Sequence, residues 1–265
     1  HLSGFEKRES TLLPYNCNPR VAPPVTLSYE ISENESENGK ARLIYGFVYS
    51  DFADKEAHLA VSVLSDILCG SNASPLKKAL LDRGLAKDAA MYAVKSRGQT
   101  VVIEIRDADE SRLDEIEETV REVITSLAKD GIDKSRLTAT LNSIEFRLRE
   151  RDFGSLPTGI AFAMSIYGSW IYGGAPEDAL LMEDTLASIR SKINTNYFET
   201  SLIKMTLENP HRAKVIMLPD KTLGRRIATT EKERLDATLA AMSESELQEI
   251  IKAEEELHLW QESEE

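Results

Sequence analysis

The sequence predicts an α+β domain, in which an antiparallel or mixed sheet is covered on one face by helices and followed by an acidic helix at the C-terminus. Two pairs of strand-like segments are each joined by a turn-rich loop, which predicts antiparallel strand pairs. The helical patterns come in groups, whereas strict alternation of strand and helix would indicate a parallel sheet. The chain has 265 residues, 42% of them hydrophobic, so it can build such a core without disulfides.

The first predicted strand pair covers residues 25–32 and 41–49. The polar stretch 33–40, which contains Gly39, has the composition of a hairpin loop. Residues 41–49 are apolar enough to be a central strand. In the first strand the apolar side chains share one face, which predicts a half-buried strand; they are Val25, Leu27, Tyr29 and Ile31.

Two helices should follow. Residues 55–69 have apolar side chains at helical spacing and end before Gly70, where a C-cap glycine is expected. In the second helix, Ser74 is the predicted N-cap, Pro75 stands at the first helical position and Gly84 ends the segment.

The rest of the chain adds more strands and helices. The second strand pair is predicted at residues 89–94 and 100–106, and a short buried strand at 213–218. Further helices are predicted at 110–129, 133–152 and 196–207. A capping box formed by Ser243 and Glu246 begins the acidic tail helix.

Residues 154–176, GSLPTGIAFAMSIYGSWIYGGAP, form the most apolar and glycine-rich segment of the chain. The helix within it is apolar nearly all round, so we expect it to be buried on most sides. Core packing is the favoured role of Trp170 and Tyr172, and contact with a bound peptide is the alternative. The candidate peptide-contact residues are Ser169, Trp170, Tyr172, Gly173 and Gly174.

The charge distribution narrows the choice of partners. The net charge is −13, which argues against a nucleic-acid partner, because nucleic-acid binders cluster Lys and Arg. Residues 231–265 contain twelve acidic and three basic residues. This charge is typical of a solvated helix, and a docking surface is the alternative interpretation. No apolar run approaches the length of a membrane span, and residues 1–10 lack the apolar core of a signal peptide.

No motif for bond cleavage or metal binding is present. Two histidines at i, i+4 spacing do not occur, and neither HExxH nor HxxEH is found. His58 is interpreted as a partly exposed residue, and Cys69 as a buried structural thiol far from Cys17. Gly173 and Gly174 could suggest a phosphate loop, but no Lys-Ser/Thr pair follows, so a turn before a new helix is favoured. We expect no metal and no catalytic residue in this chain.

Several segments nevertheless resemble one family. The segment SPLKKALLDRGL (74–85) resembles a helix in domains of the insulinase/pitrilysin zinc metallopeptidases. The segments EFRLRE (145–150), GSLPTG (154–159) and GSWIYGG (168–174) resemble the presequence-protease-like branch of that family. The tail, with MSESELQEIIKAEEEL, is similar to the first helix of the hairpin that joins the two halves of these enzymes.

The resemblance implies a metalloenzyme LuxS/pitrilysin-like peptidase domain. In this family four related α+β domains close in two halves around a chamber that digests unfolded peptides. The zinc site lies on an inverted HxxEH helix of the first domain. The equivalent helix here would be residues 55–69, which contain only His58. The resemblance therefore implies the second, non-catalytic domain together with the start of the hinge hairpin.

The expected organisation is a linker at 1–24, a peptidase-like domain without the zinc motif at 25–228, and an acidic helical segment at 229–265. The expected role is to form part of the chamber wall and hinge base of a zinc endopeptidase whose zinc lies elsewhere. The expected partners are the rest of that peptidase and unfolded peptide, with no nucleic acid and no membrane. The location would be a bacterial cytoplasm or an organelle matrix. A stand-alone peptide- or subunit-binding module of the same fold is the alternative.

Overall fold

The computed structural model describes residues 18–150 and 153–263, so most of the predicted linker, with His1 and Cys17, lies outside the described residues. The sheet has five strands in the order β1-β5-β2-β4-β3. The strands are β1 (Val25–Glu30), β2 (Ala41–Asp51), β3 (Asp88–Val94), β4 (Gly98–Ala108) and β5 (Arg212–Asp220). β2 pairs antiparallel with β4 and β5, and β3 with β4. A parallel bridge between Val21 and Arg212 makes the pairing mixed.

The chain divides into two compact units. The larger unit contains residues up to 27 and residues 38–218, and the smaller contains residues 28–37 and 219–265. The predicted domain boundaries at residues 24 and 228 stay a prediction.

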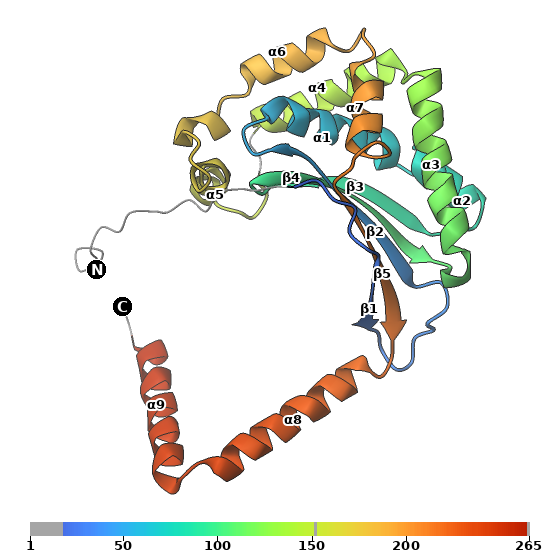
Figure 1. Ribbon diagram of the computed structural model, residues 1–265. Coiled ribbons are helices and arrows are strands. Elements are labelled where there is room, and N and C mark those ends of the chain that lie inside the picture. The colour runs from blue at the N-terminus through green and yellow to red at the C-terminus, as the bar shows by residue number, and fades with distance from the viewer. Residues whose placement is uncertain (1–17, 151–152, 264–265) are drawn as a thin grey trace. The chain divides into compact units, whose positions relative to one another are not determined.

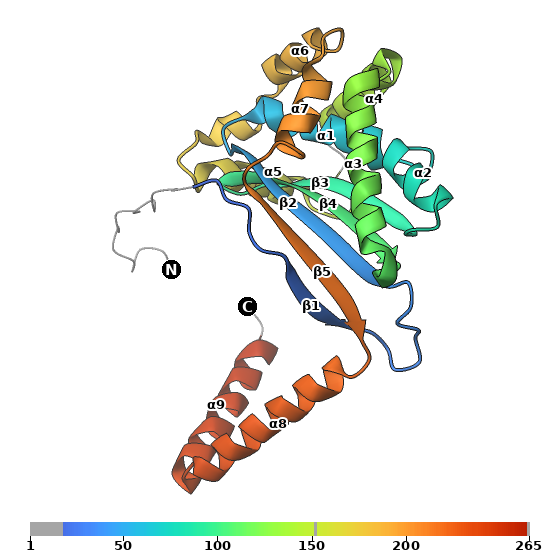
Figure 2. The same ribbon diagram turned by 45° about the vertical axis from the view of Figure 1, so that its right-hand side comes forward.

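Helices of the larger unit cover one face of its sheet, as expected (Figures 1 and 2). They are α1 (Lys55–Cys69), α2 (Pro75–Asp82), α3 (Leu113–Asp130), α4 (Lys134–Glu150), α6 (Glu183–Ser191) and α7 (Tyr197–Met205). Every second residue of β2 and β4 points toward them, so Leu43, Ile103 and Ile105 are buried together with Leu64 and Phe198 of α1 and α7. The predicted α+β class is confirmed.

The start of α2 differs in detail from the expectation. Ser74 occupies the N-cap position before Pro75, but its hydroxyl makes no capping bond. Instead the Ser74 oxygen accepts hydrogen bonds from the Ser71 backbone at 3.0 Å and from the Arg136 guanidinium at 2.9 Å. This serine therefore ties α2 to α4. Gly84 ends the segment with a positive φ of 61°, which favours glycine.

A buried carboxylate joins α7 to the turn between α3 and α4. Glu199 accepts hydrogen bonds from the Ile132 backbone at 2.9 Å and from the Lys134 ammonium at 2.8 Å. Burial by itself would raise the pKa of Glu199, but these two donors outweigh it and hold the pKa below its ordinary value. The turn is made by Gly131, whose φ is 86°.

The first strand is less buried than its pattern predicts. β1 lies at the edge of the sheet, and Val25 and Leu27 keep 47% and 50% of their surface exposed. The helices pack on β2 and β3. The edge strand β1 therefore buries less of its apolar side-chain surface than its alternating pattern predicts. The prediction of a half-buried face at residues 25–32 is wrong for these two side chains.

The smaller unit contains two long helices, α8 (Leu223–Ala241) and α9 (Glu244–Glu262). The predicted capping box is confirmed, because the Ser243 hydroxyl accepts from the Glu246 backbone at 3.3 Å and the Glu246 carboxylate accepts from the Ser243 backbone at 2.8 Å. Neither helix has a buried residue. Within the described ranges, no helix combines the length and apolar character needed to cross a membrane.

Candidate functional site

Helix α5 (Thr158–Trp170) contradicts the expectation of a buried helix. All thirteen of its residues are described, and Ala161 alone is buried. The helix packs mainly against the short 3₁₀ helix Pro176–Ala179. The large side chains Ile160, Met164, Tyr167 and Trp170 keep 51–63% of their surface exposed. An all-round apolar pattern does not distinguish burial in this chain from burial against another part of a longer protein.

The predicted peptide-contact residues differ in their surroundings: Trp170 is exposed on α5, whereas Tyr172, Gly173 and Gly174 form the turn after it. Trp170 is 60% exposed, so the prediction that it packs in the core is wrong. Tyr172 is half-buried and packs against Phe52, with ring centroids 5.5 Å apart and the ring planes tilted by 41°. Gly173 has a φ of 93°, and Gly174 donates its backbone N–H to the Ser169 carbonyl at 3.2 Å. The glycine pair therefore makes the predicted turn before the helix at Pro176.

A cleft lies between α5 and the body of the larger unit, with a volume of about 350 Å³. We call it the α1–α5 cleft, because its walls include both helices. Ser169 lines it, whereas Trp170, Tyr172, Gly173 and Gly174 are not among the lining residues. Its apolar walls come from the segment before α1, from α1, α4 and α5, and from α6 with the segment before it; they include Phe52, Leu59, Ile144, Leu148, Phe162, Met164, Leu181 and Leu186.

Cationic side chains stand around the α1–α5 cleft. Lys55, Lys95 and Arg147 line it, against a single carboxylate, Asp178. The Lys55 ammonium lies 3.6 Å from Asp178. Lys95 and Arg147 are exposed and form no ion pair with any residue in the described ranges. This excess of positive charge contrasts with the chain's net charge of −13.

His58 is half-buried on the wall of the same cleft. Its Nδ1 atom is buried and has no hydrogen-bond partner in the part of the chain that the structure describes. Burial, and then the charge of Lys95, lower the pKa of His58 to about 4, so the imidazole is neutral at pH 7. His58 is thus partly exposed, as interpreted, but its ring lines the cleft.

Sequence reasoning missed the polar members of this cleft. Lys95 lies in the β3–β4 turn and Arg147 near the end of α4, so no local motif links them to His58 of α1. The only sequence feature that could have indicated the cleft was the half-apolar helix 55–69 with its single histidine, His58.

The lining of the α1–α5 cleft is suited to ligand binding. Among the described residues no group of three or more His, Cys, Asp or Glu side chains could hold a metal ion. Cys69 is buried, as predicted, and burial raises the pKa of its thiol to about 12, which keeps it un-ionised. The α1–α5 cleft offers an apolar interior and positive charge, which together suit a ligand with an apolar group and an anion.

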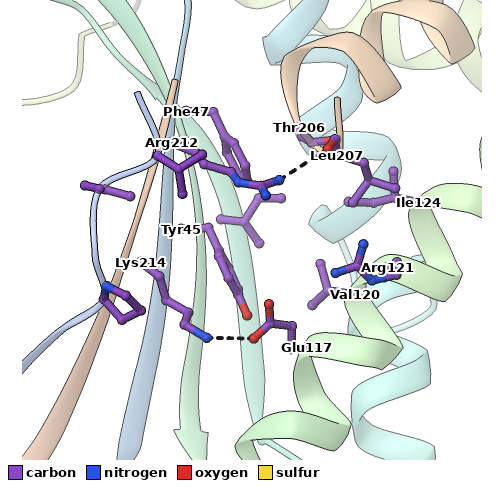
Figure 3. A pocket seen from close by; sticks show the side chains of 15 residues that line it. Tyr45, Phe47, Glu117, Val120, Arg121, Ile124, Thr206, Leu207, Arg212 and Lys214 are labelled. Atoms are coloured by element: carbon purple, nitrogen blue, oxygen red, sulfur yellow. Dashed lines mark hydrogen bonds and ion pairs between the residues drawn. The ribbon is translucent and has the colours of Figure 1, made fainter. Parts of the chain in front are cut away.

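A second cleft of about 230 Å³ lies between α3 and strands β2 and β5 (Figure 3). Its charged side chains are already engaged: the Lys214 ammonium donates to Glu117 at 2.8 Å, and Arg212 donates to the Leu207 carbonyl at 3.3 Å. The Tyr45 hydroxyl is buried without a hydrogen bond to any described residue. Burial, and then the charge of Glu117, raise the pKa of Tyr45. This cleft is mainly apolar, and both of these cationic side chains have partners on its own wall.

Two family models match the chain. Residues 1–144 match the model described as Peptidase M16 inactive domain, and residues 217–265 match the model of the region associated with subfamily C of the same peptidases. The chain is 33% identical over 227 residues to Protein HypA of Clostridium perfringens, covering 85% of this chain and 23% of that protein. It is 31% identical over 216 residues to presequence protease 1, chloroplastic/mitochondrial, of Arabidopsis thaliana, covering 79% and 20%. The chain thus spans about a fifth of the length of these relatives.

Solved structures agree with the fold. The periplasmic protease PqqL from Escherichia coli matches with a TM-score of 0.53 at 14% identity, over 83% of this chain and 23% of that one. A peptidase M16 inactive domain from Pseudomonas fluorescens matches with a TM-score of 0.50 at 15% identity, over 82% and 46%. At these identities the likeness concerns the fold alone.

Proposed function

Because this chain belongs to the peptidase M16 family and matches its inactive domain over residues 1–144, we propose that it serves a longer zinc-dependent endopeptidase as a non-catalytic, peptide-binding domain. In that enzyme it forms part of the wall of a closed chamber that degrades unfolded peptides, and residues 217–265 form the hinge base. The zinc is held by the catalytic domain, and the partners are the rest of the peptidase and the peptide. A bacterial cytoplasm or an organelle matrix is the proposed location, supported by the names of the presequence protease relatives.

One observation carries the peptide-binding part of this proposal. The helix α1, which the family resemblance equates with the zinc-binding helix of the catalytic domain, borders an open apolar cleft in which His58 stands without a Glu-His partner. A zinc-activated water requires several ligands, whereas peptide binding requires only a shaped, apolar surface. The domain therefore has a binding surface at this helix but lacks the zinc ligands that hydrolysis would require there.

The candidate contact residues fit this role in part. Ser169 lines the α1–α5 cleft, and Trp170 adds an exposed aromatic side chain next to it in sequence. Tyr172, Gly173 and Gly174 shape the turn that follows α5. We assign Ser169 and Trp170 to peptide contact, and the other three residues to holding α5 in place.

The test uses the fluorescence of Trp170. In a Trp260→Phe background Trp170 is the sole tryptophan, because the chain has two. An unfolded peptide without tryptophan should shift or quench its emission in a saturable way, and the chain alone should leave that peptide intact. No saturable change in emission together with no binding by calorimetry would refute peptide binding, and hydrolysis by the purified chain would refute the non-catalytic role. A matched background with Trp170→Phe, in which only Trp260 reports, should show no change.

A further inference from the structure

The α1–α5 cleft combines an apolar interior with positive charge, and these two properties restrict its ligand. Leu59, Ile144, Leu148 and Leu186 lie on its wall. Its volume of about 350 Å³ falls at the lower end of the range for small-ligand pockets, which is roughly 300–1,000 Å³. The space therefore suits one large apolar side chain with its adjoining backbone, not a long stretch of peptide.

Most polar groups inside the cleft are already used. The hydroxyls of Ser62, Ser96 and Ser165 donate to the carbonyls of His58, Gly98 and Ala161. The Gln99 side-chain amide donates to the carbonyls of Asp51 and Asp54. A peptide backbone crossing the cleft would bury N–H and C=O groups that find few partners there, which is costly. A chain end buries fewer such groups than a crossing segment.

The charges then decide which end of a peptide fits. Lys95 and Arg147 are exposed at the cleft and lack ion pairs among the described residues, and Lys55 shares its charge with Asp178. An N-terminal ammonium would be repelled by this set. A C-terminal carboxylate would be attracted, and charged donors give carboxylates their strongest hydrogen bonds.

We propose that the α1–α5 cleft binds the C-terminal residue of a peptide, with a large apolar side chain against Leu59 and Phe162 and the terminal carboxylate beside Lys95 and Arg147. The inference rests on the proposed peptide-binding function and adds to it a preference for free C-termini. His58 lies on the same wall of the cleft, so a bound carboxylate gains a neighbour that can take up a proton.

The test compares two N-acetylated five-residue peptides ending in phenylalanine, one with a free carboxyl and one with a C-terminal amide, by calorimetry on the 265-residue chain. The free acid should bind at least about tenfold more tightly, as expected for hydrogen bonds to charged groups. The double variant Lys95→Gln, Arg147→Gln should lose most of that difference. The matched control Lys232→Gln, Arg234→Gln, which removes the same two charges from exposed positions of α8, should retain it.

Four results would overturn the inference. Equal affinity of the acid and the amide would remove the C-terminal preference while leaving the proposed peptide-binding function intact. Tighter binding of decanoate than of the acid peptide would assign the cleft to alkyl carboxylates. Failure of every peptide to bind would overturn both this inference and the proposed function. Retention of the preference by the Lys95, Arg147 variant would place the carboxylate elsewhere.

Discussion

A β-carbon on Gly174 would lie 2.2 Å from the hydroxyl oxygen of Ser169, closer than real β-carbons approach any atom. The same β-carbon would lie 3.2 Å from the Ser169 carbonyl oxygen and from the Phe52 ring. A side chain at position 174 would therefore displace the Ser169 hydroxyl and crowd the Ser169 carbonyl and the Phe52 ring, so glycine suits the close packing of this turn against the end of α5.

Gly174→Ala should lower the free energy of unfolding by about 1–3 kcal/mol, as is typical when an added methyl group forces neighbours apart. Urea unfolding followed by circular dichroism measures this. Adding Ser169→Ala should recover part of the loss, because it removes the nearest of the clashing atoms.

Gly168→Ala is the matched control. It lies within α5, and no atom stands within 4 Å of the position of its β-carbon. This change should raise stability by roughly 0.4–1 kcal/mol, because alanine is the better helix former. Equal stability of the two alanine variants would show that the approach of Gly174 to Ser169 is not a constraint.

Glu199→Gln should destabilise the chain by about 1–3 kcal/mol at pH 7, because the buried side chain loses its charge-assisted bonds to Lys134 and Ile132. The pKa of Glu199 is lowered on folding, so its contribution is present above the unfolded pKa and is lost as the pH falls through the folded value. The difference between wild type and variant should therefore shrink in acid.

Unfolding measured from pH 7 to pH 3 tests this pH dependence. Glu208→Gln, at an exposed position close by in sequence, should have a small effect at every pH. A difference for Glu199→Gln that stays constant down to pH 3 would contradict the role of its ionised carboxylate.

Two half-buried tyrosines should respond in opposite ways to loss of the hydroxyl. Tyr49 donates to the Gln99 side-chain oxygen at 2.7 Å, so Tyr49→Phe should cost about 1–2 kcal/mol. Tyr45 has no such partner among the described residues, so Tyr45→Phe should be neutral or stabilise by up to about 1 kcal/mol. Thermal unfolding of the two variants measured in parallel tests both predictions. A larger loss of stability in Tyr45→Phe than in Tyr49→Phe would contradict them.

Binding of the free-acid peptide should strengthen several-fold between pH 7 and pH 5. The pKa of His58 in the free chain is about 4, and a nearby carboxylate raises it, so the complex takes up a proton that the free chain lacks. The other charged groups at the cleft are Lys55, Lys95, Arg147 and Asp178. Ammonium and guanidinium groups ordinarily keep their charge in this range.

Calorimetry across this pH range measures the effect, and NMR of the His58 ring reports the proton directly. His58→Gln should flatten the profile without abolishing binding, and the amidated peptide should show no such slope. A slope that persists in His58→Gln would assign the proton to another group.

The sequence was sufficient for the elements that short-range patterns specify. The strand over 41–49, the capping box at Ser243 and the helix over 55–69 each depend on neighbouring residues, and all three appear in the structure. The exposure of α5 could not be predicted. An apolar helix indicates that its surface is covered by something, but its sequence does not identify the covering segment. Nor could the cleft be predicted, since Lys95 and Arg147 meet His58 only through the packing of α4, α5 and the β3–β4 turn.

The two walls of the α1–α5 cleft differ in how firmly they are anchored. α1 has eight buried residues and belongs to the densest part of the core, whereas α5 has one. Opening of α5 should therefore require far less free energy than opening of α1, and its amide hydrogens should exchange with solvent much sooner. A cleft with one rigid wall and one more easily displaced wall can bind a constant chemical group on the α1 side while the α5 side adjusts to groups of different size.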